Sequence, residues 1–494
     1  MLFMPFGHYI NYHTISASGL AKVFFSVLPI YCINYYRSDM TLSRDMSAKQ
    51  VLNRLGMLMN QLLNGIGRAN DFLWGGPFLL LLMGTHLFFT IRLRFPQKNI
   101  FRAIKMSVTP EKNGDQQNLS VFATLTTTLA ATLGTGNIVG VSTAVALGGP
   151  GAIFWCWLTG ILGMATAYGE CFLSMRYRNR GADGVYRGGP MYVWENGLKN
   201  KPIGKIYAFL TLVTAFGVGC ATQSNSMAQT TTLSFGISPH IVGFAAAIIA
   251  GLVIIGGVKS IGKYCVNLVP LLGILYMAGC VILLWIFRDA LIPAVKLILS
   301  QALVPRAAAG GAIGASFMAA ARYGIVRGLY TNEAGIGTTA IAAAASDTTD
   351  SVRQAYVSMT AVFWDTVVMC LLSGLVVVAN ILKNPASVLA VNEAGLTDAA
   401  FMSLPIFGNA FLTVCLIAFA ITTLIGWSYM GERAAEYVAG TRGIPFYKIG
   451  YIVMVYVGAV IPLDIVWQCT DLINAMMIPP SIIALFLLHK KIII

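Results

Sequence analysis

Two short stretches place glycine beside polar residues inside long apolar blocks. The first reads GTGN at 134–137, and the second reads TNEAGIG at 331–337. Glycine costs about 1 kcal/mol in a helix interior and permits non-helical backbone, so each stretch predicts a break in a helix. Amide groups freed at a break attract a carboxylate, and freed carbonyl oxygens coordinate a hard cation such as Na⁺. Together the two breaks suit a zwitterion, such as an amino acid, that binds with a cation.

Each break also has a simpler interpretation. Small residues between helices often form packing grooves that let two backbones approach closely. One isolated Gly-x-Gly would favour that interpretation. Two breaks at matching positions of two halves, each beside Asn or Glu, favour a binding site near the membrane midplane.

Two acidic residues fall in apolar segments. Asp365 lies near the middle of an apolar block at 354–381, and Glu333 lies within the second break. Carboxylates are costly inside a membrane and indicate function by default. Asp365 is expected to bind a cation or relay a proton, or else to form a structural ion pair with Arg322 or Arg327. Glu333 is interpreted in the same way, so both are candidate coupling carboxylates.

Two further polar residues occupy apolar spans. Gln223 is expected either to contact a substrate or to form an interhelical hydrogen bond. Glu170 lies nearer the end of its span and is expected to be a structural partner of the neighbouring arginines.

The elements that must position these residues are membrane helices. Hydrophobic residues make up 57% of the 494-residue chain and charged residues 11%, whereas soluble domains carry about 25% charged residues. A helix needs roughly 20 apolar residues to cross the hydrocarbon core. About eleven blocks meet this requirement, near 72–92, 118–144, 151–175, 205–230, 240–258, 265–287, 311–345, 354–381, 408–431, 447–467 and 471–488.

The net charge of +14 is distributed unevenly among the loops. Lys and Arg gather in one set of alternate loops, which includes 92–117 and 176–205. The other set carries Arg288, Lys296, Arg306 and Lys383. By the positive-inside rule, the 92–117 loop and the C-terminus are predicted to be cytoplasmic, in a chain that crosses a bacterial inner membrane several times. The basic residues are therefore not interpreted as a nucleic-acid surface.

The spans fall into two groups of five once the first span, 72–92, is set aside. Residues 118–287 start on the cytoplasmic side and residues 311–488 on the outer side, which is the topology of an inverted repeat. The sequence thus predicts an all-α polytopic membrane protein with a 5+5 inverted repeat and two discontinuous helices. Residues 1–71 form an N-terminal extension, in which 46–70 resembles an amphipathic surface helix. Within it, 20–36 is either a further span or part of a signal, unless translation begins further in, for example at Met46.

Long stretches of the sequence resemble the alanine or glycine:cation symporter family. The resemblance runs from about residue 60 to the C-terminus. It is carried by ATLGTGNIVGVSTAVALGGPGAIFW (131–155), GECFLSMRYR (169–178), GGPMYV (188–193), RGLYTNEAGIGTTAIAAAAS (327–346), FWDTVVMC (363–370) and TTLIGWSYMGERAAEYV (422–438). It implies a leucine-transporter-type fold, coupling to Na⁺ and sometimes H⁺, and alanine or glycine as the substrate.

The resemblance also implies roles for residues of the two breaks. The substrate carboxylate is expected at the backbone around Thr135 and Gly136, and Asn137 is expected to serve either substrate or cation. The ammonium group is expected to face the second break, near Thr331, Asn332 and Gly335.

A sodium ion is expected beside the first break. By the same resemblance, it would bridge backbone carbonyls at Ala130 and Leu133 and the hydroxyl groups of Thr422 and Thr423. Trp427 follows Thr423 by four residues on the same helix face, and is expected either to wall the substrate pocket or to be an ordinary packing residue. No catalytic residues are predicted, and no cofactor other than the coupling ion.

Other classes of protein are disfavoured by missing patterns. The sequence contains no H-E-x-x-H, Walker or G-x-S-x-G motif, so an enzyme is not expected. The nine cysteines form no C-x-x-C pair and are interpreted as packing residues. A channel is disfavoured because an inverted repeat with a polar midplane suits alternating access. Sodium-coupled import of a small neutral amino acid is the predicted function, and a proton-coupled transporter, or one for a residue such as serine, is the open alternative.

Overall fold

The computed structural model describes residues 57, 61–110, 118–303, 312–386, 395–405, 408–461 and 463–494. The chain divides into two units, Met1–Ala69 and Asn70–Ile494, and the second contains nearly all of the described residues. The expected N-terminal extension at 1–71, with its amphipathic and apolar segments, lies largely outside the described residues.

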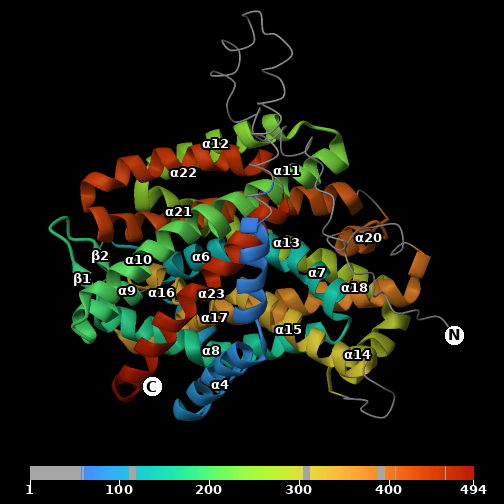
Figure 1. The fold of residues 1–494 in the computed structure, drawn as a ribbon, viewed down its shortest axis with the longest axis horizontal. Coiled ribbons are helices and arrows are strands. Elements are labelled where there is room, and N and C mark those ends of the chain that lie inside the picture. Colours follow the sequence, from blue (N-terminus) through green and yellow to red (C-terminus); the bar gives the residue numbers. More distant parts are fainter. Residues whose placement is uncertain are drawn as a thin grey trace, which may run out of the picture. The chain divides into compact units, whose positions relative to one another are not determined.

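Helices make up nearly all of the second unit (Figure 1). The longer ones are α4 (Gly76–Arg92), α5 (Ile100–Val108), α6 (Val121–Thr132), α7 (Val139–Gly148), α8 (Ala152–Arg176), α10 (Lys201–Phe216), α11 (Thr222–Phe235), α12 (Pro239–Ile255), α13 (Gly257–Ile286), α14 (Arg288–Leu303), α15 (Ala312–Asn332), α17 (Ser351–Val362), α18 (Leu371–Lys383), α21 (Gly408–Ala439), α22 (Ile444–Val460) and α23 (Leu463–Leu488). The short helices are α9 (Pro190–Tyr192), α16 (Thr339–Ala343) and α20 (Leu396–Phe401), with 3-10 turns η1 (Pro96–Asn99), η2 (Thr135–Asn137), η7 (Thr441–Gly443) and η8 (His489–Lys491). Three segments are π-helical, η3 (Val193–Gly197), η4 (Gly217–Ala221) and η5 (Phe363–Cys370). The strands β1 (Asn179–Arg180) and β2 (Tyr186–Arg187) pair antiparallel as a hairpin.

Seven helical segments of the described chain are long and apolar enough to cross a membrane singly. They are Ala152–Arg176, Lys201–Phe235, Gly257–Ile286, Ser351–Lys383, Ala410–Ala439, Thr441–Val460 and Gln468–Lys491. Two bent pairs also pass, Gln61–Leu73 with Gly76–Arg92, and Val121–Thr132 with Thr135–Gly148. The expected total of about eleven is not confirmed by this criterion, because α12 is shorter and α15, which carries two arginines, is not among the segments that pass.

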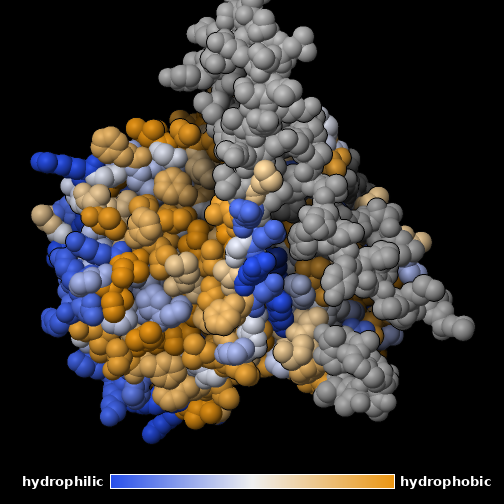
Figure 2. Space-filling view, in the orientation of Figure 1, coloured by the Kyte–Doolittle hydropathy of each residue, from blue (hydrophilic) through white to orange (hydrophobic). Residues whose placement is uncertain are grey.

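The outer surface of the second unit is apolar, as a lipid-facing surface must be. Leu252 on α12, Trp285 on α13 and Phe446 on α22 expose 72%, 70% and 78% of their area. Figure 2 shows apolar side chains over much of one face, with hydrophilic side chains gathered along its left edge, where Figure 1 places the β1–β2 hairpin. Such a surface favours aggregation in water but is stable in contact with the hydrocarbon core of a membrane.

Helices of the first half pack against their counterparts in the second half. α6 and α7 contact α16 and α15, α8 contacts α17, α11 contacts α21, and α12 contacts α22, the last two lying together in Figure 1. Interleaved pairing of this kind fits two five-helix repeats of opposite orientation. The all-α architecture with two discontinuous helices is confirmed, whereas the repeat boundaries at 118–287 and 311–488 stay predictions.

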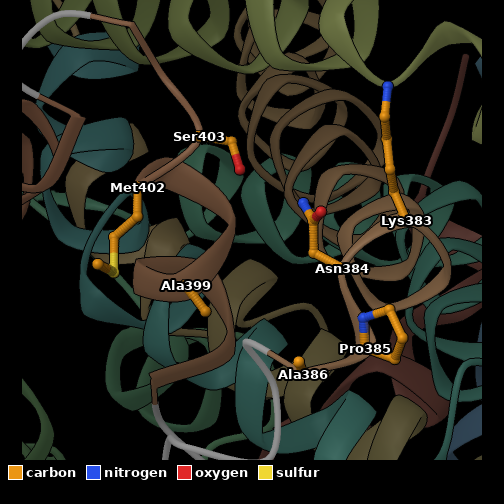
Figure 3. Close-up of a pocket in the computed structure, with 7 residues that line it drawn as sticks. All are labelled: Lys383, Asn384, Pro385, Ala386, Ala399, Met402 and Ser403. Atoms are coloured by element: carbon orange, nitrogen blue, oxygen red, sulfur yellow. The ribbon is translucent and has the colours of Figure 1, made fainter.

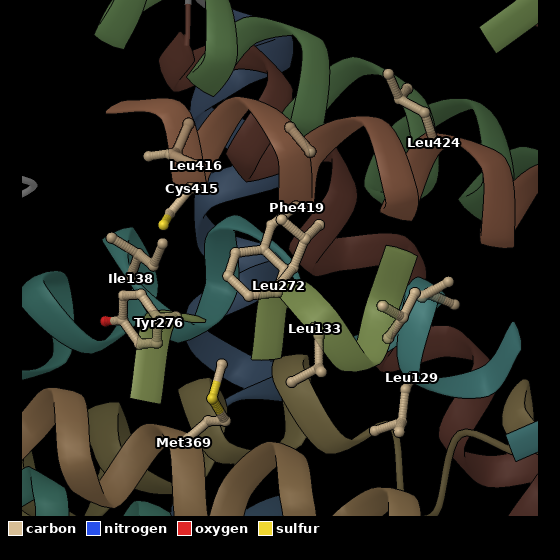
Figure 4. Close-up of a cluster of buried hydrophobic side chains, with 14 of the residues drawn as sticks. Leu129, Leu133, Ile138, Leu272, Tyr276, Met369, Cys415, Leu416, Phe419 and Leu424 are labelled. Carbon is tan, nitrogen blue, oxygen red and sulfur yellow. The ribbon is translucent and has the colours of Figure 1, made fainter. Parts of the chain in front are cut away.

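A shared hydrophobic core surrounds the first discontinuous helix. Leu129, Leu133 and Ile138 flank the break, and they belong to the same buried cluster as Tyr276 on α13 and Phe419 on α21 (Figure 4). In a membrane, where lipid tails are as apolar as Leu, such contacts stabilise through close packing. The break is therefore held between packed helices that fix the direction of its polar groups.

Candidate binding site at the two helix breaks

The first break lies between α6 and α7, which are bent by 58°. α6 ends at Thr132, because Leu133 (φ −74°, ψ 93°) and Gly134 (φ −143°, ψ −155°) leave helical geometry. The Gly134 amide donates to Asn137 Oδ1 at 3.0 Å instead of continuing the helix. Carbonyl groups in the last turn of α6 therefore lack their usual helical partners.

Gln223 on α11 contacts the first break from one side. Its Oε1 accepts from the Thr135 amide at 3.3 Å and from the Thr135 hydroxyl at 3.0 Å. A β-carbon on Gly134 would stand 3.1 Å from the same oxygen, so the glycine permits this close approach. The structure thus gives Gln223 an interhelical hydrogen bond, and its partner is the residue predicted to receive a substrate carboxylate.

Thr423 on α21 contacts the first break from the other side. Its hydroxyl donates to the Leu133 carbonyl at 3.1 Å. A β-carbon on Gly134 would stand 2.7 Å from that hydroxyl. A hydroxyl and a carbonyl oxygen, both suitable ligands for a hard cation, therefore adjoin the broken backbone.

The other two residues predicted for the cation lie close to the same helix junction. Ala130 packs on α21, since a β-carbon on Gly426 would stand 3.0 Å from the Ala130 carbonyl carbon. The Thr422 hydroxyl donates to the Phe419 carbonyl of its own helix at 2.8 Å. Thr423 is therefore the threonine that faces the break in this structure.

A chain of hydrogen bonds joins the first break to the second through η5. Asn137 donates to Asp365 Oδ1 at 2.7 Å, and Thr366 donates to Asp365 Oδ2 at 2.6 Å. The Thr366 hydroxyl lies 3.2 Å from that of Thr331 on α15. Asp365 itself lies in the π-helical segment η5, and π-helical turns are frequent at functional sites.

The arginines considered as partners of Asp365 have other neighbours. Arg322 forms a salt bridge with Asp71 at 2.6 Å. Arg327 lies over the Tyr330 ring at 5.8 Å and interacts with Asp471. The groups that donate hydrogen bonds to the Asp365 carboxylate, the Asn137 amide and the Thr366 hydroxyl, carry no charge.

The second break begins where α15 ends, at Asn332. Glu333 has φ 54°, and Gly335 and Gly337 have φ 94° and 90°. Helical geometry resumes at Thr339 in α16. A non-glycine residue in the left-handed region is strained, and such strain gathers at functional sites.

Trp427 and Thr338 enclose the carboxylate of the second break. The Thr338 hydroxyl donates to Glu333, and the Trp427 indole lies within interaction range of the same carboxylate. The indole N–H itself makes no well-formed hydrogen bond within the described chain. Trp427 is buried against Gly219 in η4, where a β-carbon would stand 2.3 Å from the Trp427 β-carbon. Trp427 therefore forms a wall between η4 and the second break.

Thr331 is the residue through which the second break meets the first. A β-carbon on Gly136 would stand 2.8 Å from Thr331 Cγ2 and 3.4 Å from the Tyr330 ring. Both contacts are close enough that Gly136 admits no side chain without movement of α15. Thr331 and the first break therefore share one site.

Asn332 and Gly335 face α4 and α8 instead. Asn332 Oδ1 accepts from the Ala334 amide at 3.0 Å. A β-carbon on Gly335 would stand 3.0 Å from Leu82 and 3.7 Å from His86, both on α4. The side of the second break on which these two residues lie thus differs from that of Thr331, with which the sequence groups them.

Glu170 on α8 does not pair with the neighbouring arginines, so that expectation was wrong. Its Oε1 accepts from the Ser481 hydroxyl at 2.8 Å. Arg176 donates to the Lys491 carbonyl at 3.0 Å, and Arg178 donates to the Ser346 carbonyl at 2.8 Å. Glu170 faces the bundle interior, whereas the arginines reach loop carbonyls beyond the end of the helix.

A β-hairpin, which the sequence does not predict, closes the end of the unit where the basic loops lie, which we call the basic end. Arg178, before β1, donates to the Thr348 carbonyl beyond α16 at 2.8 Å. Asn118, before α6, accepts from the Tyr186 amide in β2 at 2.8 Å. Arg187 in β2 pairs with Glu436 on α21 at 2.8 Å. The hairpin therefore ties together the ends of both broken helices and of the helix that carries Thr423.

A surface cleft of about 570 Å³ lies away from all these residues. Figure 3 shows its lining on and just beyond the ends of α18 and α20, namely Lys383, Asn384, Pro385, Ala386, Ala399, Met402 and Ser403. No predicted site residue is among them, and the cleft is open to the surface. The two breaks remain the candidate site.

The sequence of the chain matches one family over most of its length. A model of the sodium:alanine symporter family matches residues 59–494. The sodium/alanine symporter AgcS of Methanococcus maripaludis is 41% identical over 434 residues, which cover 87% of this chain and 95% of that protein. The probable sodium/glutamine symporter GlnT of Bacillus subtilis is 33% identical over 440 residues, which cover 87% of this chain and 90% of that protein.

Two solved transporters share the fold. A Na⁺-coupled sialic acid symporter in a substrate-bound outward-open state has a TM-score of 0.51 at 12% identity, covering 84% of this chain and 85% of that one. MhsT in complex with L-phenylalanine has a TM-score of 0.52 at 16% identity, covering 76% of this chain and 90% of that one. At these identities the likeness concerns the fold alone.

Proposed function

This chain belongs to the sodium:alanine symporter family, and we propose that it imports a small neutral amino acid, alanine or glycine, together with Na⁺ by alternating access. The observation that carries the proposal is the contact of Thr423 with the Leu133 carbonyl, two residues before the Thr135 amide. A cation-binding pair of oxygens thus adjoins an amide that suits a carboxylate. The relatives are transporters, in agreement with the expectation that the chain is not an enzyme.

The substrate carboxylate is assigned to the backbone at Thr135 and Gly136. In the structure, the Gln223 side-chain oxygen accepts from both Thr135 donors. An amide oxygen is an acceptor like a carboxylate oxygen, so Gln223 acts as a stand-in that the arriving substrate displaces. The Thr135 donors then stay paired in both states, which avoids the cost of an unmade hydrogen bond.

The substrate ammonium group is assigned to the acceptors between the two breaks. Thr331 and Asp365 supply a hydroxyl and a carboxylate in one hydrogen-bond chain, and Asn137 orients that carboxylate. An ammonium group offers three donors, and Asp365 offsets its charge in the membrane interior. Glu333 is proposed as the second coupling carboxylate. Asn332 and Gly335 are proposed to act on the substrate through the backbone of the second break and not through their side-chain positions.

The cation is assigned to oxygen ligands at Ala130, Leu133, Thr422 and Thr423. Hard cations prefer oxygen, and the carbonyl groups at the end of α6 lack helical partners. Thr423 already faces the Leu133 carbonyl. Thr422 joins the site only if its hydroxyl turns from the Phe419 carbonyl toward the break.

Trp427 is assigned to limit the length of the substrate side chain. It is buried between η4 and the carboxylate of Glu333. One methylene changes binding by only about 1–3 kcal/mol, so alanine and glycine are expected to compete. The relative named for glutamine makes a longer side chain the alternative substrate.

The membrane orientation is proposed from the distribution of charge. The basic end, with Arg178, Arg187 and the C-terminus, is placed in the cytoplasm by the positive-inside rule. The membrane is proposed to be a bacterial inner membrane.

Uptake of labelled alanine by purified protein in liposomes tests the proposal. Accumulation that requires an inward Na⁺ gradient and is competed by glycine is the expected result. Uptake with a proton gradient alone would keep the fold and change the ion, and conductance without a coupling ion would indicate a channel. Uptake of glutamine but not of alanine would replace the proposed substrate.

A further inference from the structure

Glu170 is a buried carboxylate that the proposed site does not use. It lies on α8 with 4% of its area exposed, and its Oε1 accepts from the Ser481 hydroxyl of α23 at 2.8 Å. The Gly335 amide of the second break faces the same carboxyl group. The other oxygen, Oε2, is buried without a hydrogen-bond partner among the described residues. An unpaired buried polar atom is costly and points to a ligand.

A second buried group with an unpaired atom comes from α4, outside both repeats. His86 is fully buried, and its Nδ1 lies 2.8 Å from the Thr166 hydroxyl of α8. A β-carbon on Gly163 would stand 3.9 Å from His86 Nε2 and 4.0 Å from Asn332 Oδ1. Neither His86 Nε2 nor Asn332 Nδ2 has a hydrogen-bond partner in the described part of the chain. Gly163 therefore keeps open a space that both polar side chains face.

These groups lie along one stripe of α8. Gly163, Thr166 and Glu170 follow one another at intervals of three and four residues, which places them on one helix face. That face meets the second break, because Gly335 packs on His86 and also faces Glu170. Glu170 and His86 both adjoin Gly335, and His86 and Asn332 both face the space at Gly163, so we call these three buried residues the Glu170 cluster.

The chemistry of the Glu170 cluster favours a proton over a metal ion. A hard metal cation needs several oxygen ligands. The groups that face Glu170, the Gly335 amide and the Ser481 hydroxyl, present hydrogen atoms instead. Within the described chain, no group of three His, Cys, Asp or Glu residues could hold a metal. Glu170 also forms no salt bridge within the described part of the chain, so a negative charge on it in the membrane interior requires another cation.

We propose that Glu170 is a proton-binding site of this transporter and that His86 tunes it from α4. A lone pair on Oε2 forms the O–H bond with the incoming proton, and the same bond breaks when the proton leaves, with nothing oxidised or reduced. The other titratable groups that face Glu170 are Glu333 of the second break, Tyr207 of α10 and Cys171 of α8 itself, while α23 presents Ser481.

The consequence for transport rests on the proposed function. Glu170 faces the Gly335 amide, so proton binding changes the charge that meets the backbone of the second break. That backbone is the part of the site expected to rearrange during alternating access. The protonation state of Glu170 therefore acts on the second break, whereas the proposed Na⁺ ligands lie at the first break.

Infrared difference spectroscopy of the purified full-length protein tests proton binding without any transport. Acidification should raise a protonated-carboxyl C=O band, and Glu170→Gln should remove one component of it. Glu195→Gln is the matched control, because Glu195 pairs with Lys201 on the surface at 2.7 Å, and it should leave that component in place. His86→Gln and Ser481→Ala should each shift the midpoint of the component by about one pH unit, equivalent to about 1.4 kcal/mol. A band unchanged in Glu170→Gln overturns the proposal, and if that variant does not fold, unshifted midpoints in the other two overturn it.

Sodium-driven uptake separates this inference from the proposed function. Wild-type uptake at saturating Na⁺ should vary with pH, and Glu170→Gln should flatten that variation. An infrared component that depends on Glu170, in a protein without sodium-driven uptake, would refute the proposed function alone. Unchanged pH variation in Glu170→Gln would refute the role of Glu170 in transport.

Discussion

At the scale of single residues, the site depends on two glycines, Gly134 and Gly136, because a side chain at either position would collide with its neighbours. The space beside Gly134 is entered by Thr423 and Gln223, and that beside Gly136 by Thr331. A glycine at such positions allows a ligand or another backbone to approach closely. The two glycines therefore decide whether polar groups of three helices can converge.

Replacing Gly136 by leucine is expected to abolish uptake while the protein still inserts. The new side chain would fill the space in front of Thr331, where a β-carbon alone would stand 2.8 Å from Cγ2. Gly273→Leu is the control, because nothing lies within 4 Å of a β-carbon at that position. Uptake per molecule of inserted protein is the measurement, and normal uptake by the Gly136 variant would remove the first break from the mechanism.

Replacing Thr423 by alanine is expected to raise the Na⁺ concentration for half-maximal uptake by about tenfold or more, with little change in substrate preference. A polar contact to a charged group contributes roughly 1.5–3 kcal/mol, and each 1.4 kcal/mol is tenfold in affinity. Thr360→Ala is the control, because the Thr360 hydroxyl donates to the Val357 carbonyl of its own helix at 2.6 Å. An unchanged sodium dependence in the Thr423 variant would show that this hydroxyl is not a ligand.

Asp398 on α20, outside the membrane-spanning segments, is expected to make stability depend on pH. Burial raises the pKa of Asp398 from its ordinary value of 3.8 to about 6. A carboxyl group with a raised pKa stabilises the folded state most at pH values below its ordinary pKa of 3.8, and this stabilisation is lost as the pH rises through about 6. Asp398→Asn should therefore increase the unfolding temperature at pH 7.5 and not at pH 4, in thermal unfolding followed at both values. Equal melting of the two proteins at pH 7.5 would contradict this.

Residue types predict which residues lie at the site more reliably than they predict which neighbours each side chain faces. Thr135, Gln223 and Thr331 were singled out from the sequence and lie together at the two breaks. The sequence groups Asn332 with Thr331, whereas Asn332 faces α8 in the structure. It also predicts arginine partners for Glu170, which faces the second break instead. Helical periodicity predicts which side chains share a face only while the helix continues, and positive φ values end that regularity.

At the scale of elements, the β1–β2 hairpin holds the basic end closed. Beneath it, the Leu119 amide donates to the Ala345 carbonyl at 3.0 Å and the Asp347 amide to the Leu119 carbonyl at 2.7 Å, joining the ends of the two broken helices directly. The Arg187 guanidinium holds the pKa of Asp183 at about 2. A carboxyl group with a lowered pKa stabilises the folded state at pH values above its ordinary pKa of 3.8, and this stabilisation is lost only as the pH falls through about 2. This arm of the hairpin therefore persists across the neutral range.

Replacing Arg187 by glutamine is expected to loosen the basic end. The variant leaves Glu436 on α21 without its partner from the hairpin, at a cost of roughly 1.5–3 kcal/mol. Hydrogen exchange at the Leu119 and Asp347 amides should then become about tenfold faster or more. Lys201→Gln, which removes a more exposed salt bridge, is the control. Equal exchange in the two variants would mean that the hairpin does not hold this end closed.

At the scale of the whole molecule, composition and charge predicted the architecture but not the number of spans. Apolar blocks and their alternation with basic loops follow from the bilayer itself, so they are visible in sequence. α15 is not among the apolar spans because Arg322 and Arg327 lower its mean hydropathy, yet it packs against α7 and α8 inside the bundle. The pairing of α8 with α17 and of α12 with α22 involves contacts between distant segments, which local patterns do not encode.

The whole molecule is also where the coupling of ion and substrate must be measured. The proposed cation ligand at Leu133 and the proposed carboxylate ligand at Thr135 are separated by one residue, Gly134. Each ligand therefore orders the backbone that the other needs, and linkage requires the two effects to be equal. Calorimetry on the purified protein should show that Na⁺ raises alanine affinity by the same factor, about 5–150-fold, as alanine raises Na⁺ affinity. Thr423→Ala should reduce both factors together, because it loosens the cation side of a shared segment. Alanine affinity that is independent of Na⁺ would mean that the two ligands bind to separate sites and that the first break does not couple them.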